Sequence, residues 1–421
     1  MSKSSWKEEA RVIAQQVGAY FTKVAPRLVF QRDVGLGRHG GALLIQENDA
    51  EGKRVRRLVI KYSIGHTSPD KLRNADDDLR NEAKWLKMLK GAEHIVQFID
   101  LPETSLESVA TNIAKLDLKK KEQTDPSGNT ESSTEEKGNE DLEPTPTGKV
   151  PTFALEFLEG GTLRKFINSC LDKATDVPVR LQWRIWLCMV RQCVAMAYPP
   201  QLPLDDNRSI RETIIDGQEI CRLTQNSGHS DNFLFSLPQG PEDTEHHFGM
   251  PVLKLIDFGR GILDEPEEGL FDPNEIGSKI NLWNAAGAFS ALVNLWADSE
   301  ETGALHDPVS YEYQDNGTTA TVQTLASPAL RTSEMTDRSL RDLLVRCMSA
   351  ELYVYFFSPP RVIQHVRPAA NKVLQITEER VRNRGADEDP DLAGVMEVEE
   401  DDESIARFIQ RHIFDVDDAE A

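Results

Sequence analysis

The stretch Val252–Gly261, which reads VLKLIDFGRG, decides the fold class more strongly than any other part of the chain. The residues before Asp257 are mostly apolar, which is typical of a short buried strand. A carboxylate at the end of a strand, followed by Phe258 and Gly259, combines a hard oxygen ligand with a backbone that can turn sharply. The pattern therefore predicts a ligand for Mg²⁺ on the phosphates of a nucleotide.

Far upstream, the stretch VGLGRHGGA places Gly35, Gly37 and Gly40 in the spacing G-x-G-x-x-G. Glycines let backbone N–H groups approach phosphate oxygens closely. A dinucleotide-binding fold would continue with a helix, whereas two strand-like runs, ALLIQE and RLVIKYS, follow here. Strand, loop and strand favour a flap over nucleotide phosphates, and a glycine-rich hairpin without a ligand is the alternative for this motif taken alone.

Lys61 ends the strand-like run LVIK, where its ammonium could supply a point charge to nucleotide phosphates. A lysine at a strand end is more often solvated, but Glu82 changes this balance. Glu82 lies on or beside the apolar stripe of a helix predicted over about residues 71–89. A carboxylate in such a place needs a buried partner, so the sequence predicts an ion pair between Glu82 and Lys61.

The stretch TFALEFLEGGTL, residues 152–163, is interpreted as a strand that ends in a connection between two halves of the protein. The main chain of Glu156 and Leu158 could then bond the edge of an adenine ring. A plain hydrophobic strand and turn is the alternative for this segment taken alone.

Taken together, these motifs and their order resemble a protein kinase domain, in the divergent form of fungal protein-kinase-like proteins, over about residues 27–370. The resemblance implies an α+β, bilobal fold, with a small β-rich N-lobe that holds one helix and a larger, mainly helical C-lobe. It also implies ATP and Mg²⁺ as cofactors and an unidentified protein as partner or substrate. The expected parts are an N-terminal extension (1–26), an N-lobe (27–155), a C-lobe (156–385) and an acidic tail (386–421).

The catalytic loop of the family reads H-R-D-L-x-x-x-N and precedes a short apolar strand. Here the stretch QNSGHSDNFLF makes Asn232 the second Mg²⁺ ligand and puts Ser227 in the position of the catalytic aspartate, with Gln225 on the histidine. Taking H-S-D as the triplet would make Asp231 the base, but would put Ser236 on the metal-binding asparagine. The apolar run NFLF favours the first register, and Asp231 stays the alternative base.

Further positions depart from the family in the same direction. Asn281 replaces the aspartate and Ala286 the glycine of the motif D-x-W-S-x-G, and no A-P-E triplet follows Asp257. Peptide docking and the general base are therefore both in doubt. A base contributes typically ~10²–10⁴-fold to the rate, while Mg²⁺ and the lysine carry much of the rest.

The sequence thus predicts a pseudokinase, or a very weak phosphotransferase, that binds ATP and Mg²⁺. The alternative is an active Ser/Thr-type protein kinase or small-molecule phosphotransferase whose base is Asp231, His229 or the substrate itself. A scaffold that binds no nucleotide is a third possibility, which Lys61, Glu82 and Asp257 disfavour.

Charge and composition narrow the partners and the compartment. Most of the formal net charge of −22 lies in residues 119–144 and 387–421, and no basic face stands out, which argues against nucleic acid or an anionic membrane as partner. The five cysteines are scattered and never form a C-x-x-C motif, and the N-terminus has no apolar run of signal-peptide type. We expect a cytoplasmic or nuclear protein.

Two charged segments, about residues 119–149 and the tail after 385, are predicted to be disordered because they are poor in aliphatic residues. The tail holds one helical candidate, ESIARFIQRHIF, with an apolar face made of Ile405, Phe408, Ile409 and Ile413. The sequence leaves open whether this helix docks on the body of the protein or on a partner.

Overall fold

A computed structural model of the chain divides into two compact units. Unit 1 contains Met1–Lys84 and Phe98–Phe157, and unit 2 contains Trp85–Gln97 and Leu158–Ala421. The structure describes scattered residues between 11 and 21 and then the ranges 25–36, 40–63, 75–101, 152–203, 206, 208–238, 250–263, 275–293, 308–315, 318–332, 337–350, 370–382 and 401–415. Gly37 and the segment 119–149 lie outside the described residues.

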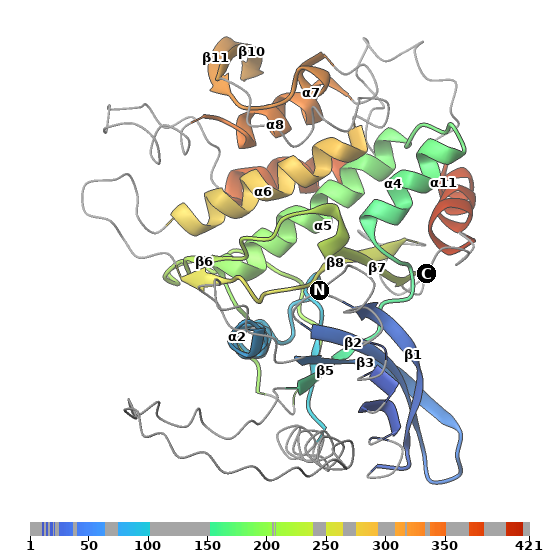
Figure 1. The fold of residues 1–421 in the computed structure, drawn as a ribbon. Coiled ribbons are helices and arrows are strands. Elements are labelled where there is room, and N and C mark those ends of the chain that lie inside the picture. The colour runs from blue at the N-terminus through green and yellow to red at the C-terminus, as the bar shows by residue number, and fades with distance from the viewer. Residues whose placement is uncertain are drawn as a thin grey trace, which may run out of the picture. The chain divides into compact units, whose positions relative to one another are not determined.

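Unit 1 contains a five-stranded antiparallel sheet in the order β1-β2-β3-β5-β4. Its strands, all but β4 labelled in Figure 1, are β1 (Leu28–Leu36), β2 (Gly40–Asn48), β3 (Arg54–Ser63), β4 (Phe98–Ile99) and β5 (Thr152–Glu156). All five overlap the strand-like apolar runs of the sequence, which are RLVFQRDVG, ALLIQE, RLVIKYS, HIVQFIDL and TFALEFLE. Short apolar runs are therefore a reliable local signal for these strands, whether they alternate or, as in β5, are buried at successive residues.

The core of unit 1 lies against this sheet and includes part of the N-terminal extension. Leu43 and Ile45 of β2 and Leu58 and Ile60 of β3 are fully buried in it. Helical residues of the extension join the same cluster, namely Ala14, Val17 and Phe21. The extension thus contributes apolar surface to the core of unit 1.

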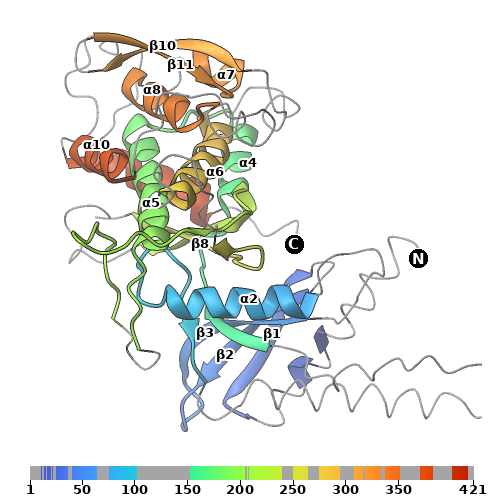
Figure 2. The ribbon, with the colours of Figure 1, turned by 90° about the vertical axis from the view of Figure 1, so that its left-hand side faces the viewer.

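Helix α2 (Ala75–Met88) lies along one face of the sheet and begins with acidic residues that favour a helix N-terminus (Figure 2). It falls within the helix predicted over residues 71–89, of which residues 71–74 lie outside the described part of the chain. Of the predicted stripe, Leu86 and Leu89 are buried, but Leu79 is only half-buried. Trp85, at 3% exposure, joins the buried face instead.

Unit 2 is built around helix α5 (Val179–Ala197), in which all residues except Arg184 are buried. The helix is thus enclosed on nearly every side, and its buried residues are mostly apolar but include polar ones such as Arg191 and Gln192. Helix α6 (Ile276–Val293) packs against α5, with Trp186 meeting Phe289 edge to face. The other helices of the unit's body are α4 (Leu163–Asp172), α7 (Pro328–Thr332), α8 (Arg338–Cys347) and α10 (Ala370–Arg382).

Two small β-ribbons contain the segments in which the sequence predicts the catalytic loop and the metal ligands. Strand β7 (Phe233–Pro238) pairs with β8 (Pro251–Leu255), and β6 (Leu223–Thr224) pairs with β9 (Ile262–Leu263), both antiparallel. The single turn η1 (Ser230–Asn232) leads into β7. The two predicted strand runs NFLFS and VLKLIDFG therefore pair with each other.

A third ribbon, β10 (Val309–Asp315) with β11 (Thr318–Thr324), is absent from the sequence prediction, which expects mostly helices here. It joins α8 through a hydrogen bond of 2.6 Å from the Tyr311 hydroxyl to Asp342. The described part of unit 2 is therefore helical with three β-ribbons, and the protein as a whole is of mixed α+β class.

The C-terminal segment 401–415 is ordered, which corrects the predicted disorder of this part of the tail. Helix α11 (Asp402–Ile409) continues into a π-helical turn η2 (Gln410–Phe414), and Ile405, Ile409 and Ile413 are buried. The apolar face that the sequence predicts therefore docks on the protein itself, against α4 (Figure 1). Its hydrophobic burial outweighs the negative charge of the surrounding tail.

Aromatic and polar contacts hold α11 and η2 against α4 and α5. Phe408 lies edge-on to Phe166 of α4, with ring centroids 6.2 Å apart, and stacks on His412. Asp402 forms a 2.8 Å ion pair with Arg180 of α5. Burial and the nearby charge of Lys173 lower the pKa of His412 to about 4, so its ring is neutral in the docked tail.

Within the described part of the chain, none of the helices combines the length and the apolar character needed to cross a bilayer.

Candidate functional site

Lys61 and Glu82 form the predicted ion pair. The Lys61 Nζ atom donates to both carboxylate oxygens of Glu82, at 2.6 and 2.8 Å. The Glu82 side chain is 3% exposed and that of Lys61 is 20% exposed, so the ammonium retains some contact with solvent. A charge pair at this depth costs desolvation free energy, and two short hydrogen bonds offset part of that cost.

The position of Lys61 follows from the sheet. It lies on β3, between its cross-strand partners Ala42 on β2 and Phe153 on β5. A strand bonded on both sides is rigid, because its backbone groups are held by two ladders. The sheet therefore fixes the Lys61 main chain, and α2 brings Glu82 to it.

The glycine-rich loop has a packing reason for one of its predicted residues. A Cβ atom on Gly40 would collide with the carbonyl oxygen of Tyr62, and one on Gly41 would collide with the Tyr62 ring. Gly35, in contrast, has room for a side chain, since a Cβ there would meet only Ala42 at 3.8 Å. Close packing of β2 on β3 thus accounts for Gly40 without a ligand.

The two predicted adenine-binding residues fall on different units. Glu156 ends β5, where it is paired with Leu58 of β3, and belongs to unit 1. Leu158 opens the second segment of unit 2 and is 6% exposed. Shortly after it, Thr162 caps the N-terminus of α4 by accepting a hydrogen bond of 3.1 Å from the Lys165 N–H.

Asp257 follows the end of β8 in a left-handed backbone conformation, with φ at +63°. This conformation is costly for a residue other than glycine, and it persists only where the surrounding structure holds it. Two hydrogen bonds do so here. The Gln225 side-chain N–H donates to the Asp257 carbonyl at 2.7 Å, and the Gly259 N–H donates to the Asp257 carboxylate at 3.3 Å.

Asn232 stands beside the Asp257 segment, because the Ile256 N–H donates to the Asn232 carbonyl at 2.9 Å. Its side-chain N–H group donates to the carbonyl of Ser227 at 2.7 Å and to the Ser227 hydroxyl at 2.9 Å. These bonds turn the nitrogen toward the loop and leave the Oδ1 atom as the acceptor. A carboxylate and an amide oxygen on neighbouring strand ends fit the hard oxygen ligands that Mg²⁺ prefers.

The loop that carries Ser227 is held by amide side chains. Gln225 accepts a hydrogen bond of 2.8 Å from the Ser227 N–H, and its own N–H donates to the Asn281 side chain at 3.1 Å. Asn281 in turn donates to the Leu223 carbonyl at 2.7 Å. Asn281 of α6 and Gln225 thus give the loop a defined shape with neutral groups only.

Asp231, the alternative base, is engaged by a residue that the sequence analysis does not single out. The Arg164 Nε atom on α4 donates to the Asp231 carboxylate at 2.7 Å. His229 lies nearby, with its Nε2 atom 3.2 Å from the Asn232 side-chain nitrogen and its Nδ1 atom 3.8 Å from Asp231. Arg164 follows the LEGGTL connection in sequence, but no periodicity relates it to Asp231.

Trp85 is the second residue that sequence reasoning misses at this site. Its ring N–H donates to the Gly261 carbonyl at 3.0 Å, and a Cβ on Gly261 would strike the indole ring. Trp85 therefore supports the turn after Asp257. Its place one turn after Glu82 on α2, on the buried side, is the only sequence signal for this role.

No family model matches the chain, and no curated protein matches it.

Proposed function

We propose that the protein is a kinase-like module that binds ATP together with Mg²⁺ and transfers phosphate weakly or not at all. The observation that carries this proposal is the buried ion pair of Lys61 and Glu82. A pair of charges at this depth adds little to stability compared with apolar residues of similar volume. A functional role, namely to hold an ammonium group toward a phosphate, accounts for it better.

The chemistry of the second residue set supports the same function. Asp257 and Asn232 offer oxygen atoms from neighbouring strand ends, which would hold Mg²⁺, and the ion would neutralise charge on the nucleotide phosphates. Lys61 with Glu82 in unit 1 would orient the phosphates.

Phosphate transfer should be slow because no carboxylate lies at the position of the catalytic base. The Ser227 hydroxyl can accept a hydrogen bond but is too weak a base to take a proton from a substrate. The Asp231 carboxylate accepts a hydrogen bond from Arg164. The residues that position the loop are nevertheless present, so slow transfer or ATP hydrolysis remains compatible with the geometry. An active phosphotransferase with another base is the second candidate, and His229, next to Asn232, is the observation that favours it.

The test is the ATP-dependent shift of the melting temperature with and without Mg²⁺, each variant being compared with its own nucleotide-free sample. At 100 times its dissociation constant, ATP should stabilise the wild type by about 2.7 kcal/mol. Lys61→Met should remove most of that shift. Lys53→Met, at an exposed position before β3, is the matched control and should leave it unchanged. An equal shift in Lys61→Met would refute the proposed site.

A further inference from the structure

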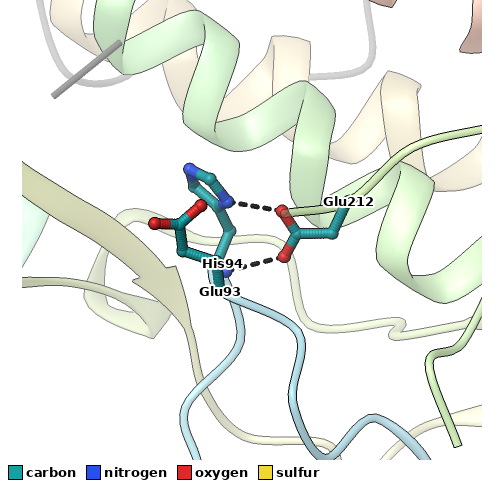
Figure 3. Close-up of side chains that lie close together, drawn as sticks. All are labelled: Glu93, His94 and Glu212. Carbon is teal, nitrogen blue, oxygen red and sulfur yellow. Dashed lines mark hydrogen bonds and ion pairs between the residues drawn. The ribbon is translucent and has the colours of Figure 1, made fainter. Parts of the chain in front are cut away.

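Among the residues that the structure describes, one buried group combines an imidazole with two carboxylates. It consists of Glu93, His94 and Glu212, whose potential ligand atoms all lie within 4.8 Å of one another (Figure 3). All three belong to unit 2. None of them takes part in the proposed function.

The chain brings these residues together through backbone pairing. The Ile210 N–H donates to the Gly91 carbonyl at 2.6 Å, and the Glu93 N–H donates to the Ile210 carbonyl at 3.1 Å. The next residues pair with β8, since the Leu255 N–H donates to the His94 carbonyl at 2.9 Å. Backbone hydrogen bonds therefore fix the position of this group directly beside β8, the strand that precedes Asp257.

Glu212 holds His94 at two points. One carboxylate oxygen accepts from the His94 main-chain N–H at 2.7 Å, and the other lies 2.6 Å from the His94 Nδ1 atom. Figure 3 shows both Glu212 oxygens turned toward His94, with Glu93 close by. An imidazole nitrogen and a carboxylate oxygen are thus presented side by side from segments that are far apart in sequence.

Glu93 supplies the observation that points to a ligand. The residue is 7% exposed, and its Oε2 atom is buried without a hydrogen-bond partner among the described residues. The Arg211 Nε atom lies 3.8 Å from this oxygen, beyond hydrogen-bonding distance. A buried carboxylate oxygen in this state needs a donor or a cation, because desolvation without compensation is costly.

We propose that Glu93, His94 and Glu212 form a binding site for a divalent transition-metal ion, with Zn²⁺ as the best fit. Zinc accepts imidazole and carboxylate ligands at about 2.0–2.2 Å, and three protein ligands leave one position for a water molecule. Ligand atoms in such a site lie a little over 3 Å apart, so small side-chain shifts would close the present group around an ion. The ion would also offset the negative charge of the two glutamates.

Positive charges near the group set the expected strength of binding. Arg191, Arg211 and Lys254 all lie close enough to act on His94 or Glu212 electrostatically. Arg191 also donates to Glu378 at 2.7 Å, which shares its charge with a third carboxylate. Because these cations oppose a metal ion, the affinity should be lower than at a cysteine-rich zinc site.

The experiment begins with full-length protein that is stripped with a chelator, checked by circular dichroism and reloaded with ZnCl₂. After removal of free metal, elemental analysis should find about one zinc ion per chain. Glu93→Gln, which changes little in volume, should weaken zinc binding at least tenfold in a chelator competition, since even indirect partners of a metal typically contribute about 10–100-fold. Glu47→Gln is the matched control, because Glu47 is also buried, at 5% exposure, but pairs with Arg27 and Arg56 in unit 1.

A second measurement keeps the proposal testable if Glu93→Gln fails to fold. X-ray absorption of the zinc-loaded wild type should show only nitrogen and oxygen ligands at about 2.0–2.2 Å. Less than about a tenth of an ion per chain, equal affinity in wild type and Glu93→Gln, or sulfur in the coordination shell would overturn the proposal. The group would then be a hydrogen-bonded lock between the segment 91–97 and Glu212.

Discussion

The Lys61–Glu82 pair and the loop from Gln225 to Asn232 differ in the kind of interaction that defines them. The pair joins two full charges through hydrogen bonds of 2.6 and 2.8 Å. In the loop, the contacts among Gln225, Ser227 and Asn232 are all between neutral groups. Its only described ion pairs involve Asp231, at the half-exposed edge of the segment.

The difference teaches that binding and catalysis can depend on separate parts of one protein. Under the proposed function, the pair supplies the charge that orients a phosphate, whereas the loop has a defined shape without a group that can accept a proton at Ser227. Under the proposed function, changes in the pair should alter stability and nucleotide binding. Changes in the loop should alter turnover with little effect on stability.

The largest expected effect tests how much the C-terminal helix α11 stabilises the protein. Deleting residues 401–421 removes α11 and η2 from α4, the helix whose Arg164 bonds Asp231. Three buried isoleucines at about 2 kcal/mol each suggest a loss of roughly 6 kcal/mol in the free energy of unfolding. Calorimetry should show a drop of about 10 °C or more in the melting temperature.

Deletion of residues 416–421 alone is the control for this truncation, because it leaves both helical segments in place. It should change the melting temperature by less than about 2 °C. A similar small change after the longer deletion would show that the docked helix contributes nothing to the body of the protein.

The next prediction compares the loss of stability on removal of Lys61 with that on neutralisation of Glu82. Lys61→Met takes the lysine from a carboxylate that is 3% exposed, and should cost about 3–5 kcal/mol in the free energy of unfolding. Glu82→Gln leaves a lysine that is 20% exposed and can turn its ammonium toward water, so the cost should be only about 1–2 kcal/mol. Urea denaturation measures both.

The double variant Lys61→Met/Glu82→Gln completes a thermodynamic cycle for the pair. It should be more stable than Lys61→Met alone, because the buried charge is then gone. Equal costs for the two single variants, or additive costs in the double variant, would show that burial of the Glu82 charge does not dominate.

The smallest expected effect concerns the loop. Ser227→Asp restores a carboxylate beside Asn232 and should raise phosphotransfer or ATP hydrolysis by up to ~10²-fold, measured by release of labelled phosphate. Adding Asp257→Ala should abolish the gain, since the base cannot act without the metal that aligns the phosphate. Ser227→Asn has the same shape as the aspartate but no charge, and should give no gain.

Asp231→Ala distinguishes the two registers of the loop. If Ser227 occupies the base position, Asp231→Ala should cost little activity, because the Asp231 carboxylate is hydrogen-bonded to Arg164. Loss of wild-type activity in Asp231→Ala, with no gain in Ser227→Asp, would establish the other register.

Residues whose role depends on local pattern were predictable. The five sheet strands follow from short apolar runs, and the partner of Glu82 follows from a charge set among the apolar positions of a helix. Gly40, which the sequence assigns to a phosphate loop, also has a packing role that the pattern does not reveal, because a Cβ there would collide with Tyr62. The β10–β11 hairpin was missed although Asp315, Asn316 and Gly317 form a turn signal between alternating residues.

The sequence by itself determined the α+β class, the strand that carries Asp257 and the presence of an amphipathic helix in the tail, because period and turn chemistry act over a few neighbouring residues. Only the tertiary structure decided that this helix docks on α4, that Arg164 engages Asp231 and that Glu93, His94 and Glu212 meet in one buried place. Such contacts join residues that are far apart along the chain. Their geometry depends on how whole strands and helices pack, and that packing leaves no local pattern in the sequence.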